Sequence, residues 1–136
     1  MSILVAEDDP CDALLLEQAF CQASMHVPIH FVDTGQEVLE YLRGEPPFAN
    51  RAAHPLPTLL LLDLDLLRNN EFEMLKWLRQ QPALDGLRVV AFGSSVDAED
   101  LDRAQALGAD AHLLKPEDAG AMIEAVEQLK SDWLAQ

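Results

Sequence analysis

Short apolar runs alternate five times with longer amphipathic segments along the chain. This alternation is typical of a parallel β-sheet with helices on both faces, because each strand is then buried on both sides. It predicts strands near residues 2–6, 28–33, 58–63, 88–93 and 110–114, each followed by a helix. We therefore expect an α/β fold with a doubly wound, five-stranded parallel sheet, and the order 2-1-3-4-5 suits a chain of this length.

Local signals mark several helix boundaries. Asp9-Pro10 offers an N-cap followed by proline at the first helical position, and Thr34 with Glu37 has the form of a capping box. Near the end of the chain, apolar residues recur at spacings of four, three and four, which places them on one buried helical stripe. These residues are Met122, Val126, Leu129 and Trp133.

Residues 44–57 contain four prolines and no periodicity, so they predict a long surface loop between the second helix and the third strand. The total of 136 residues fits one domain. We expect a single domain over residues 1–136, without an output domain.

The charge balance is strongly acidic, with 24 Asp and Glu against 9 Lys and Arg and a net charge of -15. Such a surface repels phosphate backbones and anionic lipid, which disfavours nucleic acid and membranes as partners. The start lacks the basic region of a signal peptide and no apolar run reaches the length of a membrane span, so a cytoplasmic protein is expected. Cys11 and Cys21 lie ten residues apart on one predicted helix and cannot form a disulfide there.

Polar residues gather where the predicted strands end, which is where doubly wound sheets bind ligands. They are Glu7, Asp8 and Asp9 after the first strand, Asp63 and Asp65 at the third, Gly93, Ser94 and Ser95 at the fourth, and Lys115 after the fifth. Several carboxylates in one pocket repel one another and require a cation or raised pKa values; an oxygen-rich site suits Mg²⁺ or Mn²⁺. With a metal ion and Lys115 neutralising an incoming phosphoryl group, an oxygen of Asp63 could attack its phosphorus atom.

The sequence resembles the receiver domain of two-component response regulators, which has a flavodoxin-like fold, over nearly its whole length. The matching motifs are Ile3-Leu4-Val5-Ala6-Glu7-Asp8-Asp9-Pro10, Leu59-Leu60-Leu61-Leu62-Asp63-Leu64, Leu107-Gly108-Ala109-Asp110-Ala111 and Leu113-Leu114-Lys115-Pro116. The long proline-rich loop resembles the single-domain subgroup that includes phytochrome-associated regulators. The resemblance implies that Asp63 is the phosphoacceptor, that Glu7, Asp8, Asp63 and the backbone carbonyl of Asp65 hold Mg²⁺, that Lys115 contacts the phosphoryl group, and that the bond before Pro116 is cis.

Some positions depart from the family pattern. Gly93 stands where the family has a Thr or Ser that hydrogen-bonds the phosphoryl group, so this switch is weakened, lost or taken over by Ser94 or a backbone N–H. Ser94 equally fits a small-residue turn before the fourth helix. Leu67 and Asn70-Glu71 replace the family's Pro and Asp-Gly, and His112 occupies the place of its rotating aromatic residue. His112 is either a polar version of that switch or an exposed strand residue.

Three functions remain open from the sequence. The first is a response regulator, not itself an enzyme, that accepts a phosphoryl group on Asp63 from a histidine kinase, with a phytochrome-type kinase as a candidate. It would signal through protein contacts or a homodimer. The second is an interaction module that phosphorylation does not regulate, which Gly93 supports. The third is a haloacid dehalogenase-type phosphatase, suggested by Asp63-Leu64-Asp65 but opposed by the position of the acidic motif at the start of the chain.

Overall fold

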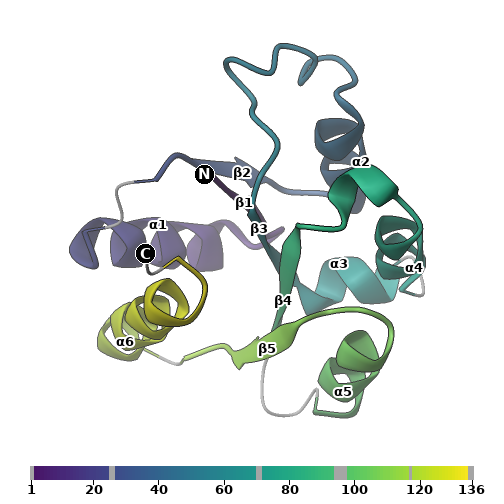
Figure 1. The fold of residues 1–136 in the computed structure, drawn as a ribbon. Helices are drawn as coiled ribbons and strands as arrows, with labels where there is room; N and C mark the ends of the chain where they lie inside the picture. Colours follow the sequence, from purple (N-terminus) through teal and green to yellow (C-terminus); the bar gives the residue numbers. More distant parts are fainter. Residues whose placement is uncertain (1, 25–26, 70–71, 94–97, 117, 135–136) are drawn as a thin grey trace.

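The computed structural model describes residues 2–24, 27–69, 72–93, 98–116 and 118–134 (Figure 1). Its five-stranded parallel sheet has the order β2-β1-β3-β4-β5, which confirms the predicted fold. The strands are β1 (Ile3–Ala6), β2 (Ile29–Val32), β3 (Leu59–Asp63), β4 (Arg88–Gly93) and β5 (Ala111–Leu114). The α-helices are α1 (Pro10–Gln22), α2 (Gly35–Arg43), α3 (Leu64–Asn69), α4 (Glu73–Arg79), α5 (Ala98–Ala106) and α6 (Ala119–Leu129), with a 3-10 turn at Pro82–Leu84 and a π-helical turn at Lys130–Leu134.

The sheet separates two hydrophobic clusters because successive strand residues point to opposite faces. Leu59 and Leu61 of β3 pack with α1 and α6, whereas Leu60 and Leu62 pack with α2, α3, α4 and α5. Figure 1 shows the same division, with α1 and α6 on one side of the sheet and the other helices opposite. The four consecutive leucines are buried for this reason. Within the described ranges, no helix is long and apolar enough to cross a membrane.

The predicted helix starts are confirmed. The backbone N–H of Cys11 donates to Asp9 Oδ1 at 2.8 Å, and Pro10 is the first residue of α1. At the start of α2, the N–H of Glu37 donates to Thr34 Oγ1 at 3.1 Å. Both caps satisfy backbone donors that the first helical turn leaves without a partner.

The predicted buried stripe of the last helix and the absence of a disulfide between Cys11 and Cys21 are confirmed among the described residues. Both cysteines of α1 are free and exposed. Met122, Val126 and Leu129 are buried, and Trp133 packs partly buried against the same cluster. In α4, Met74 and Leu78 are buried in the other cluster, and Trp77 packs partly buried against it.

The third βα unit differs from the single helix that the pattern predicts. Helix α3 begins directly at Leu64, and a second helix, α4, begins at Glu73. Between them, Phe72 has a left-handed backbone with φ of 65° and is buried, and its N–H donates to the carbonyl of Leu67 at 2.9 Å. Such a conformation is uncommon for a residue with a side chain, and hydrophobic periodicity does not reveal it. The change of direction lets both short helices turn apolar faces to the same core.

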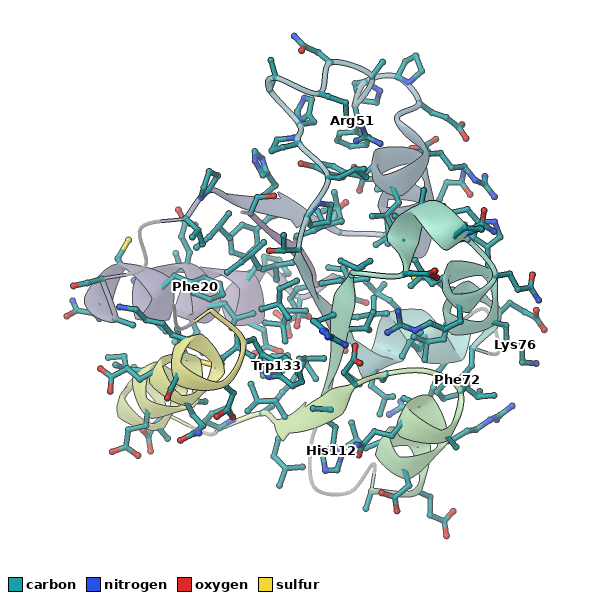
Figure 2. All side chains as sticks on the ribbon, viewed as in Figure 1. Phe20, Arg51, Phe72, Lys76, His112 and Trp133 are labelled. Carbon is teal, nitrogen blue, oxygen red and sulfur yellow. The ribbon has the colours of Figure 1, made fainter. Side chains whose placement is uncertain are left out.

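Residues 44–57 form the predicted surface loop, and Arg51 holds it to the end of α2 (Figure 2). The guanidinium donates to the carbonyls of Tyr41, Leu42 and His54 at 2.8, 3.0 and 3.1 Å. Carbonyls in the last turn of a helix lack intrahelical donors, so Arg51 caps α2 from a distance in sequence. The rings of Tyr41, Phe48 and His54 pack together beneath it.

Candidate functional site

The register of the sheet brings the first two acidic residues together. Ala6 of β1 pairs with Leu62 of β3, so the residues that follow, Glu7 and Asp63, lie side by side where both strands end. Both are buried, at 3% and 1% exposure. Burial of two carboxyl groups so close together is costly unless a proton or a cation accompanies them.

Lys115 supplies a positive charge from the far end of the chain. Its Nζ lies 3.0 Å from Asp63 Oδ2, 3.0 Å from Asp12 Oδ2 and 3.2 Å from Glu7 Oε2. The backbone N–H of Lys115 donates to the carbonyl of Gly93 at 2.7 Å, which fixes this residue at the end of β5. Burial opposes the charge of Lys115, but hydrogen bonds to Asp12 and Asp63 outweigh it and hold its pKa above the ordinary value.

Glu7, Asp8 and Asp63 each offer a carboxylate oxygen to one point, with the three oxygens within 4.8 Å of one another. Glu7 Oε2 is buried, and no donor among the described residues forms a hydrogen bond to it. Burial and the neighbouring Asp63 raise the pKa of Glu7 to about 9. A hard divalent cation fits this donor set, because it would give the buried oxygen a partner and displace the proton.

The pKa of Asp63 is shifted in the opposite direction to that of Glu7. Burial raises its pKa, but hydrogen bonds from Glu7, the backbone N–H of Asp65 and Lys115 outweigh burial and hold the pKa below its ordinary value. The Asp65 N–H donates to Asp63 Oδ1 at 2.9 Å. Of the two buried carboxyl groups, Glu7 and Asp63, Asp63 is therefore the one that stays ionised, as an attacking oxygen must.

Asp65 contributes its backbone and not its carboxylate to this arrangement. Its side chain forms an ion pair with Arg68 at 2.8 Å, and Arg68 also donates to Asp100 of α5 at 3.0 Å. The predicted metal contact through the Asp65 carbonyl stays a prediction.

The two predicted switch positions, Gly93 and His112, have apolar and polar surroundings respectively. A Cβ atom added to Gly93 would come within 3.1 Å of Leu64 and 3.4 Å of Leu101, so apolar side chains crowd the first atom of any side chain at this position. His112 is exposed on β5, where its Nδ1 contacts Gln105 of α5 (Figure 2). Ser94 lies outside the described residues, as do Asn70 and Glu71; Leu67 is fully buried.

One prediction about this site is corrected. Among the described residues the cis peptide bond joins Pro46 to Pro47, so the expectation of a cis bond between Lys115 and Pro116 is wrong for this structure. The trans isomer is the intrinsic preference of an X–Pro bond, by about 0.5–1 kcal/mol. With a trans bond before Pro116, the side chain of Lys115 reaches Asp63.

Sequence reasoning missed Asp12 and Arg68. Asp12 lies in the first helical turn directly after the acidic motif Glu7-Asp8-Asp9, and this proximity in sequence was the available signal. The contact of Asp12 with Lys115, 103 residues away, had no local signal. The same holds for the bridge from Arg68 to Asp100.

Comparisons with known proteins agree with this geometry. A model of the response regulator receiver domain matches residues 3–127. The probable methanogenesis regulatory protein FilR2 of Methanothrix harundinacea (strain 6Ac) is 30% identical over 132 residues, which cover 97% of this chain and 83% of FilR2.

Solved structures are similar over almost the full length. The crystal structure of response regulator RPA3017 in red light signaling of R. palustris has a TM-score of 0.89 and 34% identity, covering 98% of this chain and 93% of that one. That of the phosphorylated cyanobacterial phytochrome response regulator RcpA has a TM-score of 0.85 and 26% identity, covering 98% and 94%. The chain therefore belongs to the response regulator receiver domain family of two-component signalling, where it resembles phytochrome response regulators.

Proposed function

We propose that Asp63 accepts a phosphoryl group from the phosphohistidine of a sensor histidine kinase. The observation that carries this proposal is the surroundings of Asp63: a buried, ionised carboxylate beside two further carboxyl groups, with Lys115 Nζ 3.0 Å from its Oδ2. An isolated turn-capping aspartate would need neither the lysine nor the acidic pair.

The transfer balances with the residues present. An oxygen of Asp63 forms a bond to phosphorus while the bond from phosphorus to the imidazole nitrogen of the donor breaks, and the imidazole leaves with the electron pair. Lys115 stabilises negative charge on the phosphoryl oxygens, and the N–H of Asp65 holds the second oxygen of Asp63. Hydrolysis of the resulting acyl phosphate reverses the modification.

Mg²⁺, or Mn²⁺ in its place, fits between Glu7, Asp8 and Asp63, with the carbonyl of Asp65 as a further ligand. When bound, the ion neutralises charge on the transferred group. The orphaned oxygen of buried Glu7 supports this assignment independently of the family.

The relatives support a candidate donor, and the exposed face of the last βα units is the candidate for output. RPA3017 is described in red light signaling and RcpA as a phytochrome response regulator, so a phytochrome-type kinase is the first candidate donor. Output would pass through protein contacts on the face of β4, α5 and β5, where Leu114 is 49% exposed. A homodimer on this face is one form of that output.

The experiment is phosphorylation by acetyl phosphate with Mg²⁺, followed by intact mass. We expect one added phosphoryl group on the wild-type protein and on Asp85→Asn, an exposed control, and none on Asp63→Asn or in excess EDTA. Phosphorylation of Asp63→Asn to the wild-type level would contradict the assignment of the acceptor.

Gly93 favours one alternative, an interaction module that phosphorylation does not regulate. The apolar side chains of Leu64 and Leu101 lie against Gly93, where a phosphate-sensing hydroxyl would stand. Absence of an adduct with both acetyl phosphate and a cognate kinase would support this module. The family match and the strand order give the phosphatase alternative no support.

A further inference from the structure

The ammonium group of Lys115 lies among three carboxylates and an aromatic ring. Three carboxylate oxygens, from Asp12, Asp63 and Glu7, lie within 3.2 Å of Nζ, and the ring of Phe92 lies 5.3 Å away from it. Nζ donates hydrogen bonds to Asp12 Oδ2 and Asp63 Oδ2, whereas Glu7 Oε2 lies only at ion-pair distance. Only 19% of the Lys115 side chain is exposed.

The carboxylates of Asp12, Asp63 and Glu7 are not equivalent once a cation is bound. Glu7 and Asp63 belong to the group whose oxygens converge on the metal position, and Asp12 does not. A divalent ion competes with Lys115 for the first two carboxylates and leaves the third available. Transfer of a phosphoryl group to Asp63 changes that contact as well. Asp12 is thus the acceptor that can hold Lys115 through every stage of the reaction.

Asp12 is also well placed to act as an anchor. It lies in the first turn of α1, whose start is fixed by Pro10 and by the cap from Asp9. The positive end of the helix dipole attracts an acidic side chain there. The distance from Asp12 Oδ2 to Lys115 Nζ is 3.0 Å, equal to that from Asp63 Oδ2.

We infer that Asp12 is a positioning residue, which holds the ammonium group of Lys115 over Asp63 while the metal ion and the phosphoryl group occupy the other carboxylates. This inference rests on the proposed function for its role in catalysis, but the hold on Lys115 exists without phosphorylation. Asp12 acts through its hydrogen bond to Lys115 and not on the reacting carboxylate. Its contribution is to the placement of charge around the phosphoryl oxygens.

The first measurement follows the position of Lys115 directly. The chain contains three lysines, Lys76, Lys115 and Lys130, so selective ¹³C labelling of lysine ε-carbons gives three resonances, assigned with Lys76→Arg and Lys130→Arg. In saturating Mg²⁺ we expect the Lys115 side chain to be ordered in the wild-type protein and as mobile as Lys76 in Asp12→Ala. Glu17→Ala, which removes an exposed acidic residue of the same helix, is the matched control and should leave Lys115 ordered.

The second measurement is the rate of phosphorylation by acetyl phosphate at saturating Mg²⁺. We expect Asp12→Ala to slow the rate about tenfold, which corresponds to about 1.4 kcal/mol. Asp12→Asn keeps an oxygen acceptor in the same place, so its rate should stay within about threefold of wild type. A role for Asp12 only in the helix dipole would make Asn as harmful as Ala, because both lack the charge.

Equal order of Lys115 in the wild-type protein and Asp12→Ala would overturn the inference, as would equally slow rates for Asp12→Asn and Asp12→Ala. Failure of the wild-type protein to accept any phosphoryl group is a different result. It would remove the proposed function, while the ¹³C measurement would still decide whether Asp12 positions Lys115.

Discussion

Gly93 is present because of the space around it, and restoring a side chain there should destabilise the protein. Its backbone φ lies outside the left-handed region, so its conformation does not require glycine. An ideal Cβ atom would lie 3.1 Å from Leu64 Cδ2, 3.2 Å from Leu64 Cβ and 3.4 Å from Leu101 Cδ2. The first two distances are shorter than ordinary van der Waals contact, so neighbouring side chains would have to move.

The magnitude follows from two opposing effects. Overpacking a well-packed core costs about 1–3 kcal/mol, whereas replacing a glycine within a strand recovers about 0.5–1 kcal/mol. We expect Gly93→Ala to lower the free energy of unfolding by about 1 kcal/mol. Gly93→Thr, whose Cβ carries two further heavy atoms, should lower it by about 2 kcal/mol.

Urea denaturation followed by the fluorescence of Trp77 and Trp133 measures this change. With a denaturant slope of about 2 kcal/mol/M, the Gly93→Thr midpoint should fall by about 1 M. In a Leu64→Ala background the cost of Gly93→Thr should shrink by at least about 1 kcal/mol. Val38→Ala, a buried change in the same cluster, provides the control background and should leave that cost unaltered.

Unchanged or increased stability of Gly93→Thr would refute the argument that Leu64 and Leu101 occupy the switch position. An equal cost of Gly93→Thr in the Leu64→Ala and Val38→Ala backgrounds would show that Leu64 is not the cause. A stable Gly93→Thr protein would also leave room for a hydroxyl switch, and so weaken the case for an unregulated interaction module.

Two further predictions concern stability. Arg51→Ala should lower the free energy of unfolding by about 2 kcal/mol, because it removes three hydrogen bonds to carbonyls, two of them in the last turn of α2. The control Arg88→Ala, which removes an exposed arginine, should lower it by less than about 0.5 kcal/mol. Equal effects of the two substitutions in urea denaturation would disprove the capping role of Arg51. In EDTA, stability should fall as the pH rises from about 4.5 towards about 9, because Glu7 binds its proton more tightly in the folded state than in the unfolded one. Glu7→Gln should flatten this decline; an unchanged slope in denaturation at pH 5 to 8.5 would contradict it.

Much of the fold was predictable because its signals are local. The apolar run before Asp63 defines β3, and the caps at Asp9 and Thr34 mark α1 and α2 within a few residues of sequence. The break at Phe72 was not predictable, because a left-handed backbone at a buried aromatic residue follows from packing against the core and not from periodicity.

The sequence by itself determined the order of elements, the strand ends at which Glu7, Asp63 and Lys115 stand, and hence the kind of chemistry at this edge of the sheet. Only the tertiary structure decided that Asp12 shares Lys115 with Asp63 and that Leu64 fills the space beside Gly93. The physical reason is the separation along the sequence over which each interaction acts. Hydrophobic period and helix capping act over a few residues, whereas contacts between residues 103 and 29 positions apart depend on strand register and on how side chains fill the core.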